Sequence, residues 1–406
     1  MQSPVTAVPL RRSRMAFGSF LGVDRSASAA LVLRTSMIAL LVAIGYYVGS
    51  QIGFFFTPSH TPLSILWPPN AILLAALLLT PRRIWWVLVL AVFPVHFLIQ
   101  LSMGIPALSA LGWFVGNVGE ALLGAAGIRY FYEEKQPLFA SLRGVVTFWV
   151  FGVLLAPLLT SFLDAGSTDL TGLGRGYWTL WMSRLTSNMI ANLTVAPAVV
   201  TLVSAATRRF WKINWGQSFE AAQLVAGTAV VAWLVFARGN LFGHGAAFIC
   251  APLPFLVWAA VRFGPAGLSI TMLEVTMISV WSAREGIGIF EYSTMPSRVV
   301  SVHILLGLFV LPLMLLAAVV AERRGDKETS DNALALLICG QGEERLRIAR
   351  ELHTDIAGRL ALAGIGLEEL RGHLSASGKL LLNRLSDEIS DALEFTLRLS
   401  QKLSRA

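Results

Sequence analysis

The sequence predicts an all-α protein: a polytopic membrane helix bundle of about ten and at least eight spans, then a cytoplasmic helical hairpin that dimerises into a four-helix bundle. Three observations lead to this prediction. Only 14% of the 406 residues are charged and the mean hydropathy is +0.66, whereas average chains carry about 25% charged residues. The balance of acidic and basic residues changes near residue 321. Beyond that point the apolar residues recur at three- and four-residue spacing, as on one face of a helix.

The charge distribution separates the two parts. Residues 1–320 contain 19 Lys and Arg and 10 Asp and Glu, whereas residues 321–406 contain 13 and 14. The net charge of +8 therefore belongs to the membrane part, where basic residues mark the cytoplasmic side of a bilayer. We expect membrane lipid around this part and no nucleic-acid partner.

Residues 1–30 are predicted to be a cytoplasmic N-terminal segment. They contain Arg11, Arg12, Arg14 and Arg25 and no long apolar core, so they do not fit a cleaved signal peptide. The transmembrane domain follows at 31–321, because stretches of about 20 apolar residues suit the bilayer core. Ten apolar stretches are candidate spans: 29–56, 64–80, 84–103, 107–128, 144–163, 178–205, 221–237, 246–263, 267–282 and 299–321.

The loops between these spans alternate in charge. With the N-terminus inside, 16 Lys and Arg lie in inside segments, and only Arg175, Arg238, Arg284 and Arg298 lie outside. This bias predicts a multi-pass membrane protein with both termini in the cytoplasm. Eight spans would give the same arrangement of the termini.

Polar residues within the predicted spans mark a candidate ligand site: Trp67 and Asn70 in the second span, Asn117 and Glu120 in the fourth, Arg184, Asn188 and Asn192 in the sixth, and Glu274 in the ninth. A charged group inside a span costs roughly 2.5–3.5 kcal/mol and usually faces a partner in the bundle interior. We therefore expect Glu120 to pair with Arg184. Two interpretations stand side by side: a polar ligand cavity near the bilayer centre, or a helix cap and polar links between helices. No metal site is expected, since Cys250 and Cys339 are distant and lie in unlike surroundings.

The order of these motifs resembles a known family. The Trp67-Pro-Pro-Asn70 opening, the Asn117-x-x-Glu120 span, and the Asn188-x-x-x-Asn192 face leading to Ala196-Pro197 are similar to the first class of MASE-type membrane-associated sensor domains, over residues 35–320. Such domains usually precede kinase, cyclic-diguanylate or other signalling modules. The resemblance implies a membrane sensor and names no common ligand.

The last part of the chain has two helical stripes. One contains Leu346, Ala349, Leu352, Ile356, Leu360, Ala363, Leu367, Leu370 and Leu374, and the other contains Leu382, Leu385, Ile389, Ala392, Thr396, Leu399 and Leu403. Turn formers at 373–378 separate them. Two such helices bury their stripes best as a four-helix bundle of two chains, so we expect a homodimer. Residues 322–342 are predicted to be a helical linker, in which Gly340 and Gly342 permit a bend.

His353 is the candidate reactive residue of this hairpin. Its spacing places the imidazole at the edge of the bundle, where solvent can reach it. Two interpretations fit this position: an ordinary surface histidine and a nucleophile. The run Ile348-Ala-Arg-Glu-Leu-His353, within 343–406, resembles the phosphoacceptor helix of the third HisKA class of sensor histidine kinases, of the hexose-phosphate and nitrate-sensor type. The resemblance implies that His353 is the phosphoacceptor and that a response regulator is a partner. It also implies that the membrane is the bacterial cytoplasmic (inner) membrane.

Three features depart from that family's pattern. Thr354 stands where the family has an acidic general base, which leaves Asp355 as a weak substitute one position later. Gly358 stands where the family has a glutamine that serves phosphatase chemistry. No ATP-binding motif follows within these residues, so we expect no cofactor, and ATP only through a downstream or partner ATPase domain. A shortened chain and a naturally short signalling protein both fit this pattern.

These features are compatible with three functions. The leading hypothesis is a membrane-embedded sensor of a two-component system, which receives a ligand or a partner membrane protein as signal and relays phosphoryl groups through His353. The second is a catalytically incomplete kinase relative that acts as a dimerisation or scaffold partner, which Thr354 and Gly358 favour. The third, less supported, is a transporter.

Overall fold

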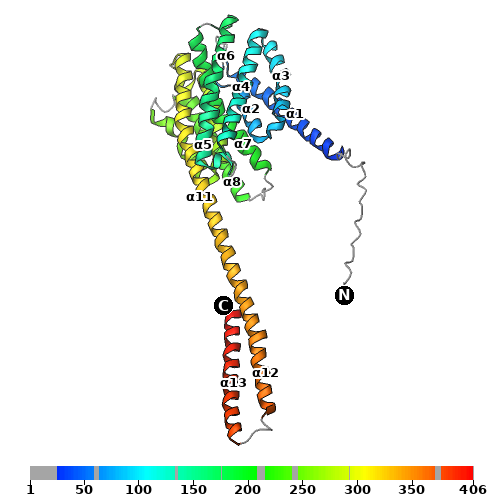
Figure 1. Cartoon of the computed structure of the whole chain (residues 1–406). Helices are drawn as coiled ribbons and strands as arrows, with labels where there is room; N and C mark the ends of the chain where they lie inside the picture. Colours follow the sequence, from blue (N-terminus) through cyan, green and yellow to red (C-terminus); the bar gives the residue numbers. More distant parts are fainter. Residues whose placement is uncertain are drawn as a thin grey trace, which may run out of the picture. The chain divides into compact units, whose positions relative to one another are not determined.

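The computed structural model describes residues 25–58, 64–132, 136–174, 176–207, 215–239, 246–291, 293–370 and 376–405. These residues form helices and no strand (Figure 1). The chain divides into two compact units, residues 1–322 and 323–406, called here the membrane unit and the C-terminal unit.

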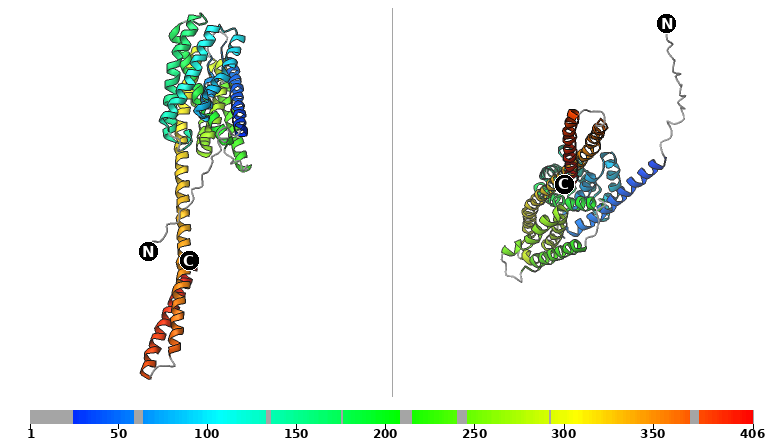
Figure 2. Two further views of the ribbon diagram at one scale, coloured as in Figure 1. Left: turned by 45° about the vertical axis from the view of Figure 1, so that its right-hand side comes forward. Right: turned by 90° about the horizontal axis from the view of Figure 1, so that it is seen from below.

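The long helices of the membrane unit are α1 (Arg25–Phe55), α3 (Trp85–Ser102), α4 (Ala107–Phe131), α6 (Ala156–Leu170), α7 (Tyr177–Thr207), α8 (Trp215–Arg238), α10 (Gly264–Glu285) and the first part of α11 (Met295–Glu351). The shorter ones are α2 (Pro68–Leu79), α5 (Leu142–Phe148) and α9 (Leu253–Trp258), with π-helical turns η3 (Trp149–Leu155) and η6 (Ala259–Phe263) and 3-10 turns η1 (Arg82–Ile84), η2 (Leu138–Ala140), η5 (Ala246–Cys250) and η7 (Gly288–Phe290). The bundle is seen from two further sides in Figure 2.

Eight of the described helical segments are long and apolar enough to cross a membrane, and one of these is the 43-residue stretch Phe248–Phe290. The expected span 64–80 contains α2, whose 12 residues cover about 18 Å at 1.5 Å per residue, short of the bilayer core. The expected spans 246–263 and 267–282 fall within one apolar stretch, Phe248–Phe290. Gly264 interrupts that stretch with φ +66°, a backbone conformation that ends one helical piece and redirects the next.

Two contacts show the reversal at Gly264. Before it, Arg262 forms an ion pair with Glu220 at 2.9 Å, near the start of α8. After it, a side chain at Gly288 would meet the backbone of Phe236 near the end of α8. The chain therefore returns along α8 before Gly264 and runs parallel to α8 after it.

α2 lies at the centre of the membrane unit, packed against α1, α4 and α7. Its sequence, PPNAILLAALLL, is apolar on all sides, and such a helix is stable only when it is buried all round. Its first residues are Pro68 and Pro69, which suit a helix start because the first N–H groups have no partner within the helix. α2 therefore begins inside the bundle and presents Asn70 there.

The C-terminal unit contains the end of α11, the π-helical turn η8 (Leu352–Ile356), α12 (Ala357–Leu370) and α13 (Ala376–Arg405). α11 is one helix of 57 residues that continues through Gly340 and Gly342 without a break. α13 packs against α12 and η8, and Ser400 Oγ donates to the carbonyl of Ala349 at 2.9 Å. Part of the predicted turn, residues 371–375, lies outside the described residues, as do residues 1–24 and several of the loop arginines counted above.

Candidate functional site

The Glu120 carboxylate on α4 is fully enclosed in the membrane unit, with 1% of the residue exposed. Its Oε2 accepts a hydrogen bond from Asn188 Nδ2 at 2.7 Å, and its Oε1 accepts one from Asn192 Nδ2 at 2.9 Å. Thr160 Oγ1 on α6 donates a longer bond of 3.4 Å. The four-residue spacing of Asn188 and Asn192 places both amides on one face of α7, so a single carboxylate receives both.

Pro157 on α6 leaves a backbone carbonyl free to accept a hydrogen bond from Asn192. In η3 the backbone bonds span five residues, and Ala156 N–H donates to the carbonyl of Phe151. The next donor in that series would be residue 157, which is proline and has no N–H. The carbonyl of Gly152 therefore receives no bond from that position, and Asn192 Nδ2 donates to it at 2.8 Å. The π-helical turn thus supplies an acceptor for α7, a role π-helical turns often have at functional sites.

Asp164 on α6 is the second buried carboxylate, with no exposed surface. It lies one turn from Thr160 and faces Gly116, which lies one turn from Glu120 on α4. A Cβ at Gly116 would fall 2.0 Å from Asp164 Oδ1, so the carboxylate occupies the space that a side chain at position 116 would need. Neither oxygen of Asp164 has a hydrogen-bond partner among the described residues.

Arg184 on α7 lies in the same cluster. Its guanidinium carbon is 4.2 Å from the ring centroid of Trp113, a cation–π arrangement. The indole Nε1 of Trp113 is fixed by a 2.8 Å bond to Thr168 Oγ1. Its positive charge interacts with the carboxylates of Asp164 and Glu120. The expected direct pair of Glu120 with Arg184 is wrong in that form: among the described residues no ion pair within 4.0 Å joins them, because the two asparagines of α7 occupy the carboxylate.

Tyr46 on α1 and His96 on α3 extend the cluster. His96 Nε2 lies 3.0 Å from the carbonyl of Ala110, which can only accept, so Nε2 carries the proton. In the neutral ring Nδ1 is then an acceptor, and the hydroxyl of Tyr46 donates to it at 2.9 Å. The Tyr46 oxygen in turn accepts from Asn117 Nδ2 at 3.3 Å. This chain of bonds leaves Asn117 Oδ1 without a partner in the described part of the protein.

We call this assembly the polar centre. Its members come from α1, α2, α3, α4, α6 and α7 and are all at most 4% exposed: Tyr46, Asn70, His96, Asn117, Glu120, Asp164, Arg184, Asn188 and Asn192. Asn70 is fully buried at the start of α2, and its amide makes no hydrogen bond with any described residue. Six helices thus meet at one buried, charged group of side chains.

The remaining predicted membrane residues lie apart. The Trp67 ring packs directly against Gly53, where an added Cβ would lie 2.4 Å from the ring. The same ring stands edge-on to Phe54. Glu274 on α10 is half-buried and has none of the polar centre as a hydrogen-bond partner in the described part of the chain.

Sequence reasoning missed Tyr46, His96 and Asp164. The rule that singled out Glu120 could have found Asp164, which is an ionisable residue one position beyond the expected span 144–163.

A short irregular segment links the polar centre to α11. Residues 64–67 precede α2 without helical structure. The carbonyl of Ile65 is satisfied by His303 Nε2 on α11 at 2.9 Å, and Ser64 Oγ donates to the carbonyl of Gly53 at 2.7 Å. Irregular backbone at this depth needs such partners, because lipid offers none. His303 therefore connects α11 to the segment that positions Asn70.

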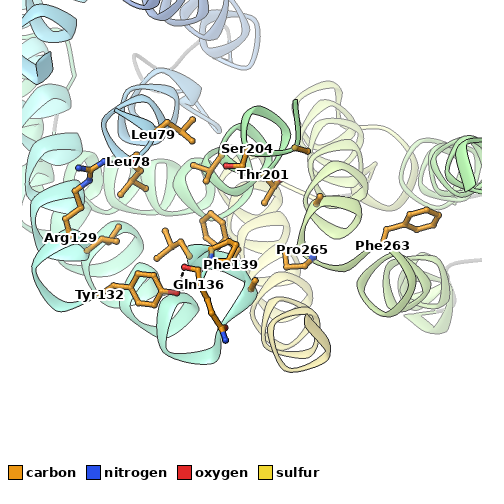
Figure 3. A pocket seen from close by; sticks show the side chains of 17 residues that line it. Leu78, Leu79, Arg129, Tyr132, Gln136, Phe139, Thr201, Ser204, Phe263 and Pro265 are labelled. Atoms are coloured by element: carbon orange, nitrogen blue, oxygen red, sulfur yellow. Dashed lines mark hydrogen bonds between the residues drawn. The ribbon is translucent and has the colours of Figure 1, made fainter. Parts of the chain in front are cut away.

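A cavity of about 570 Å³ lies at the other end of α2, beside Leu78 and Leu79 (Figure 3). Arg129 donates from Nη2 to the carbonyls of Leu78 and Thr80, at 2.8 and 2.7 Å, and so closes the end of α2. The Tyr132 hydroxyl donates to the carbonyl of Gln136 at 2.9 Å. None of the residues of the polar centre lines this cavity, so the two sites are separate.

In the C-terminal unit His353 is exposed and lies within η8. Arg347 holds both Glu344 and Glu351 at 2.5 Å on the turns before it, and its hydrogen bond lowers the pKa of Glu344. Asp355 is 72% exposed and lies 3.9 Å from Arg359. The exposed imidazole is reachable by a reaction partner, whereas Asp355 is directed to an arginine on its own helix.

Residues 38–324 match the family model of MASE1. The chain belongs to the MASE1 family. The match covers every residue of the polar centre and ends near the start of the C-terminal unit. No curated protein and no solved structure matches the chain. MASE1 domains are membrane-associated sensors, typically of histidine kinases and related signalling proteins, so the chain is a multi-pass membrane protein with a sensor domain of this family.

Proposed function

We propose that the MASE1 unit senses a signal at the polar centre and passes it through α11 to a dimeric histidine phosphoacceptor hairpin of a two-component system. The observation that carries this proposal is the continuity of α11, a single helix from Met295 to Glu351. It touches the segment before α2 through His303 and ends two residues before His353. We infer that a shift of the polar centre is passed along this helix, which is continuous from the membrane unit into the C-terminal unit.

The C-terminal unit has surface for a second copy. Large apolar side chains of its helices are exposed within one chain, including Leu346, Ile356, Leu362, Ile365, Leu385 and Phe395. Exposed apolar rows of this size usually mark an interaction surface. A four-helix bundle of two hairpins would cover them. In this homodimer, His353 receives a phosphoryl group from ATP that is bound by another domain or protein. His353 then passes the group to a response regulator.

The phosphoacceptor assignment is tested on the full chain with a complete kinase of the same type and radiolabelled ATP. The wild-type protein should acquire label, and His353→Ala should lose it. Asp355→Asn should keep most of the label, because Asp355 faces Arg359. Equal labelling of the wild type and His353→Ala would contradict the assignment.

The scaffold alternative rests on Thr354 and Gly358, which replace the family's base and glutamine. It predicts a dimer that takes up no label under any of these conditions. Thr354→Asp should then restore labelling if the missing base is the cause. Labelled wild-type protein would exclude a purely structural role for the hairpin.

The membrane topology is tested with the exposed Cys339. In a Cys250→Ser background, a membrane-impermeant maleimide should label Cys339 only after the cells are permeabilised, because the proposal places the C-terminal unit in the cytoplasm. Labelling in intact bacteria would overturn the proposed orientation.

A further inference from the structure

The cavity at the end of α2 has the dimensions of a ligand site. Its volume is about 570 Å³, and its walls come from the last residues of α2, α4 and α7, from η2, and from the junction of η6 with α10 (Figure 3). Gln136 and Pro137 of its lining are exposed, so it opens at the surface beside η2. Sites for small molecules usually have volumes of roughly 300–1,000 Å³, so this cavity can hold one.

The cavity lies at the end of the bundle from which α11 leaves the membrane unit. The backbone N–H of Leu142, just after η2, donates to Glu322 Oε2 at 3.4 Å, and Glu322 is the last residue of the membrane unit. Arg129 belongs to the segments that the charge bias places inside. In the proposed topology the cavity therefore opens to the cytoplasm and to the headgroups of the cytoplasmic leaflet.

Much of the lining is apolar. α2 contributes Leu78 and Leu79, α4 contributes Ile128, α7 contributes Val200, and η2 contributes Phe139. Ile128 and Phe139 are buried, so they form part of the floor of the cavity. Removing such a surface from water favours the binding of a hydrocarbon chain or ring.

The lining also contains hydrogen-bonding side chains. Thr201 and Ser204 lie three residues apart, on one face of α7, and Gln136 contributes an amide. Arg129 is the one charged residue among the lining residues that the structure describes. Two carbonyls at the end of α2 hold its guanidinium in the cavity wall, at 2.8 and 2.7 Å. A guanidinium matches the geometry of carboxylate and phosphate groups, so the lining suits a ligand with an apolar part and an anionic group.

Phe139 and Pro265 connect this cavity to α11. Both residues line the cavity, and both also line a small gap that Met314 and Ala317 of α11 help to form. The Phe139 ring is fixed edge-on to Phe148 of α5, with the ring centroids 4.9 Å apart. A ligand in the cavity would thus rest on side chains that adjoin α11.

We propose that this cavity binds a small anionic amphiphile, whose anionic group lies at Arg129 and whose apolar part lies among Ile128, Phe139 and Val200. Two sources have this chemistry: an anionic lipid of the cytoplasmic leaflet, and a soluble organic acid or phosphate ester. The site gives the sensor a second input, which reaches α11 through Phe139. The inference goes beyond the proposed function, because binding here requires neither the polar centre nor phosphotransfer.

The test measures thermal unfolding of the purified full chain in nanodiscs of phosphatidylcholine, whose headgroup has no net charge. In one arm phosphatidylglycerol replaces an increasing fraction of the lipid, and in the other hexyl phosphate is added to the neutral nanodiscs. The unfolding midpoint should rise saturably in at least one arm, by about 5 °C at an excess of ~100 Kd, because ligand binding stabilises the folded state.

The two arms distinguish the sources, since the first identifies a lipid and the second a soluble ligand. Hexanol, which has the same chain without the charge, should give no saturable rise. Unchanged midpoints in both arms would overturn the proposal, and so would an equal rise with hexanol and hexyl phosphate.

Variants locate the effect at the cavity. Ser204→Phe fills the cavity from α7 and should abolish the rise, whereas Ala206→Phe, on the exposed surface of the same helix, should keep it. Arg129→Gln should weaken binding by about tenfold or more. Arg143→Gln, at an exposed arginine outside the lining, should leave binding unchanged.

Should Arg129→Gln fail to fold, the pair of phenylalanine variants still decides. A rise that persists in Ser204→Phe would overturn the proposal, by showing that the anion binds elsewhere on the protein.

Discussion

Gly116→Ala tests how closely α4 and α6 approach at the polar centre. The new Cβ would lie 2.0 Å from Oδ1 and 2.8 Å from Cγ of Asp164. Asp164 is fully buried, so its carboxylate cannot move out into solvent. Overpacking of this kind costs typically 1–3 kcal/mol. We expect a fall of the unfolding midpoint by roughly 2–6 °C, at about 2 °C per kcal/mol for a chain of this size.

Gly119→Ala is the matched control on the same helix. Its Cβ would meet only Thr160 Cγ2, at 3.6 Å, which is ordinary van der Waals contact. This variant should lie within about 0.5 kcal/mol of the wild type. Thermal unfolding in nanodiscs measures both variants, and a Gly116→Ala midpoint equal to that of Gly119→Ala would refute the packing argument. The double variant Gly116→Ala with Asp164→Ala should recover part of the loss, because the two residues are in contact and their effects are not additive.

Two further predictions concern single hydrogen-bonding groups. Glu120→Gln replaces one carboxylate oxygen with an NH₂ group, which faces the Nδ2 donor of Asn188 or Asn192 and cannot accept its hydrogen bond. It should lower the free energy of unfolding by about 1–3 kcal/mol. Glu274→Gln should lower it by less than half of that, and equal losses would show that the asparagines do not recognise the Glu120 carboxylate. Ser400→Ala removes the buried bond to the carbonyl of Ala349 and should lower the helicity midpoint of the C-terminal unit by the equivalent of about 1 kcal/mol, whereas a variant of an exposed α13 serine, Ser404→Ala, should leave it unchanged.

The sequence predicted the elements whose physical cause is local. The all-α class, the long spans and the continuation after residue 321 follow from apolar runs and helical spacing, and the structure has all three. The Pro68-Pro69 pair predicted a helix start, and α2 begins at Pro68. Glu120 and Arg184 were predicted to face the bundle interior because charge is costly in lipid, and both do.

What the sequence could not predict depends on register between helices. Nothing in the order of residues states that Asn188 and Asn192, rather than Arg184, reach Glu120; that follows from how α4 and α7 are aligned. The length of α2 was also overestimated, because apolar residues before Pro68 were counted into the span although the two prolines prevent the helix from extending backward. Asp164 was not predicted, because it lies one residue beyond the expected span 144–163, where a charged side chain can reach water at little cost in free energy.

The coupling of the polar centre to the hairpin is the central claim, and crosslinking at Cys339 tests it most directly. The rate of Cys339–Cys339 crosslinking by a short bismaleimide would be measured in native membranes. Three proteins would be compared: the Cys250→Ser parent, and the same protein with Glu120→Gln or Glu274→Gln added. If the polar centre is coupled to the hairpin, a crosslinked dimer forms, and its rate of formation changes at least severalfold with Glu120→Gln and not with Glu274→Gln. An absence of dimer, or equal rates in all three proteins, would contradict it.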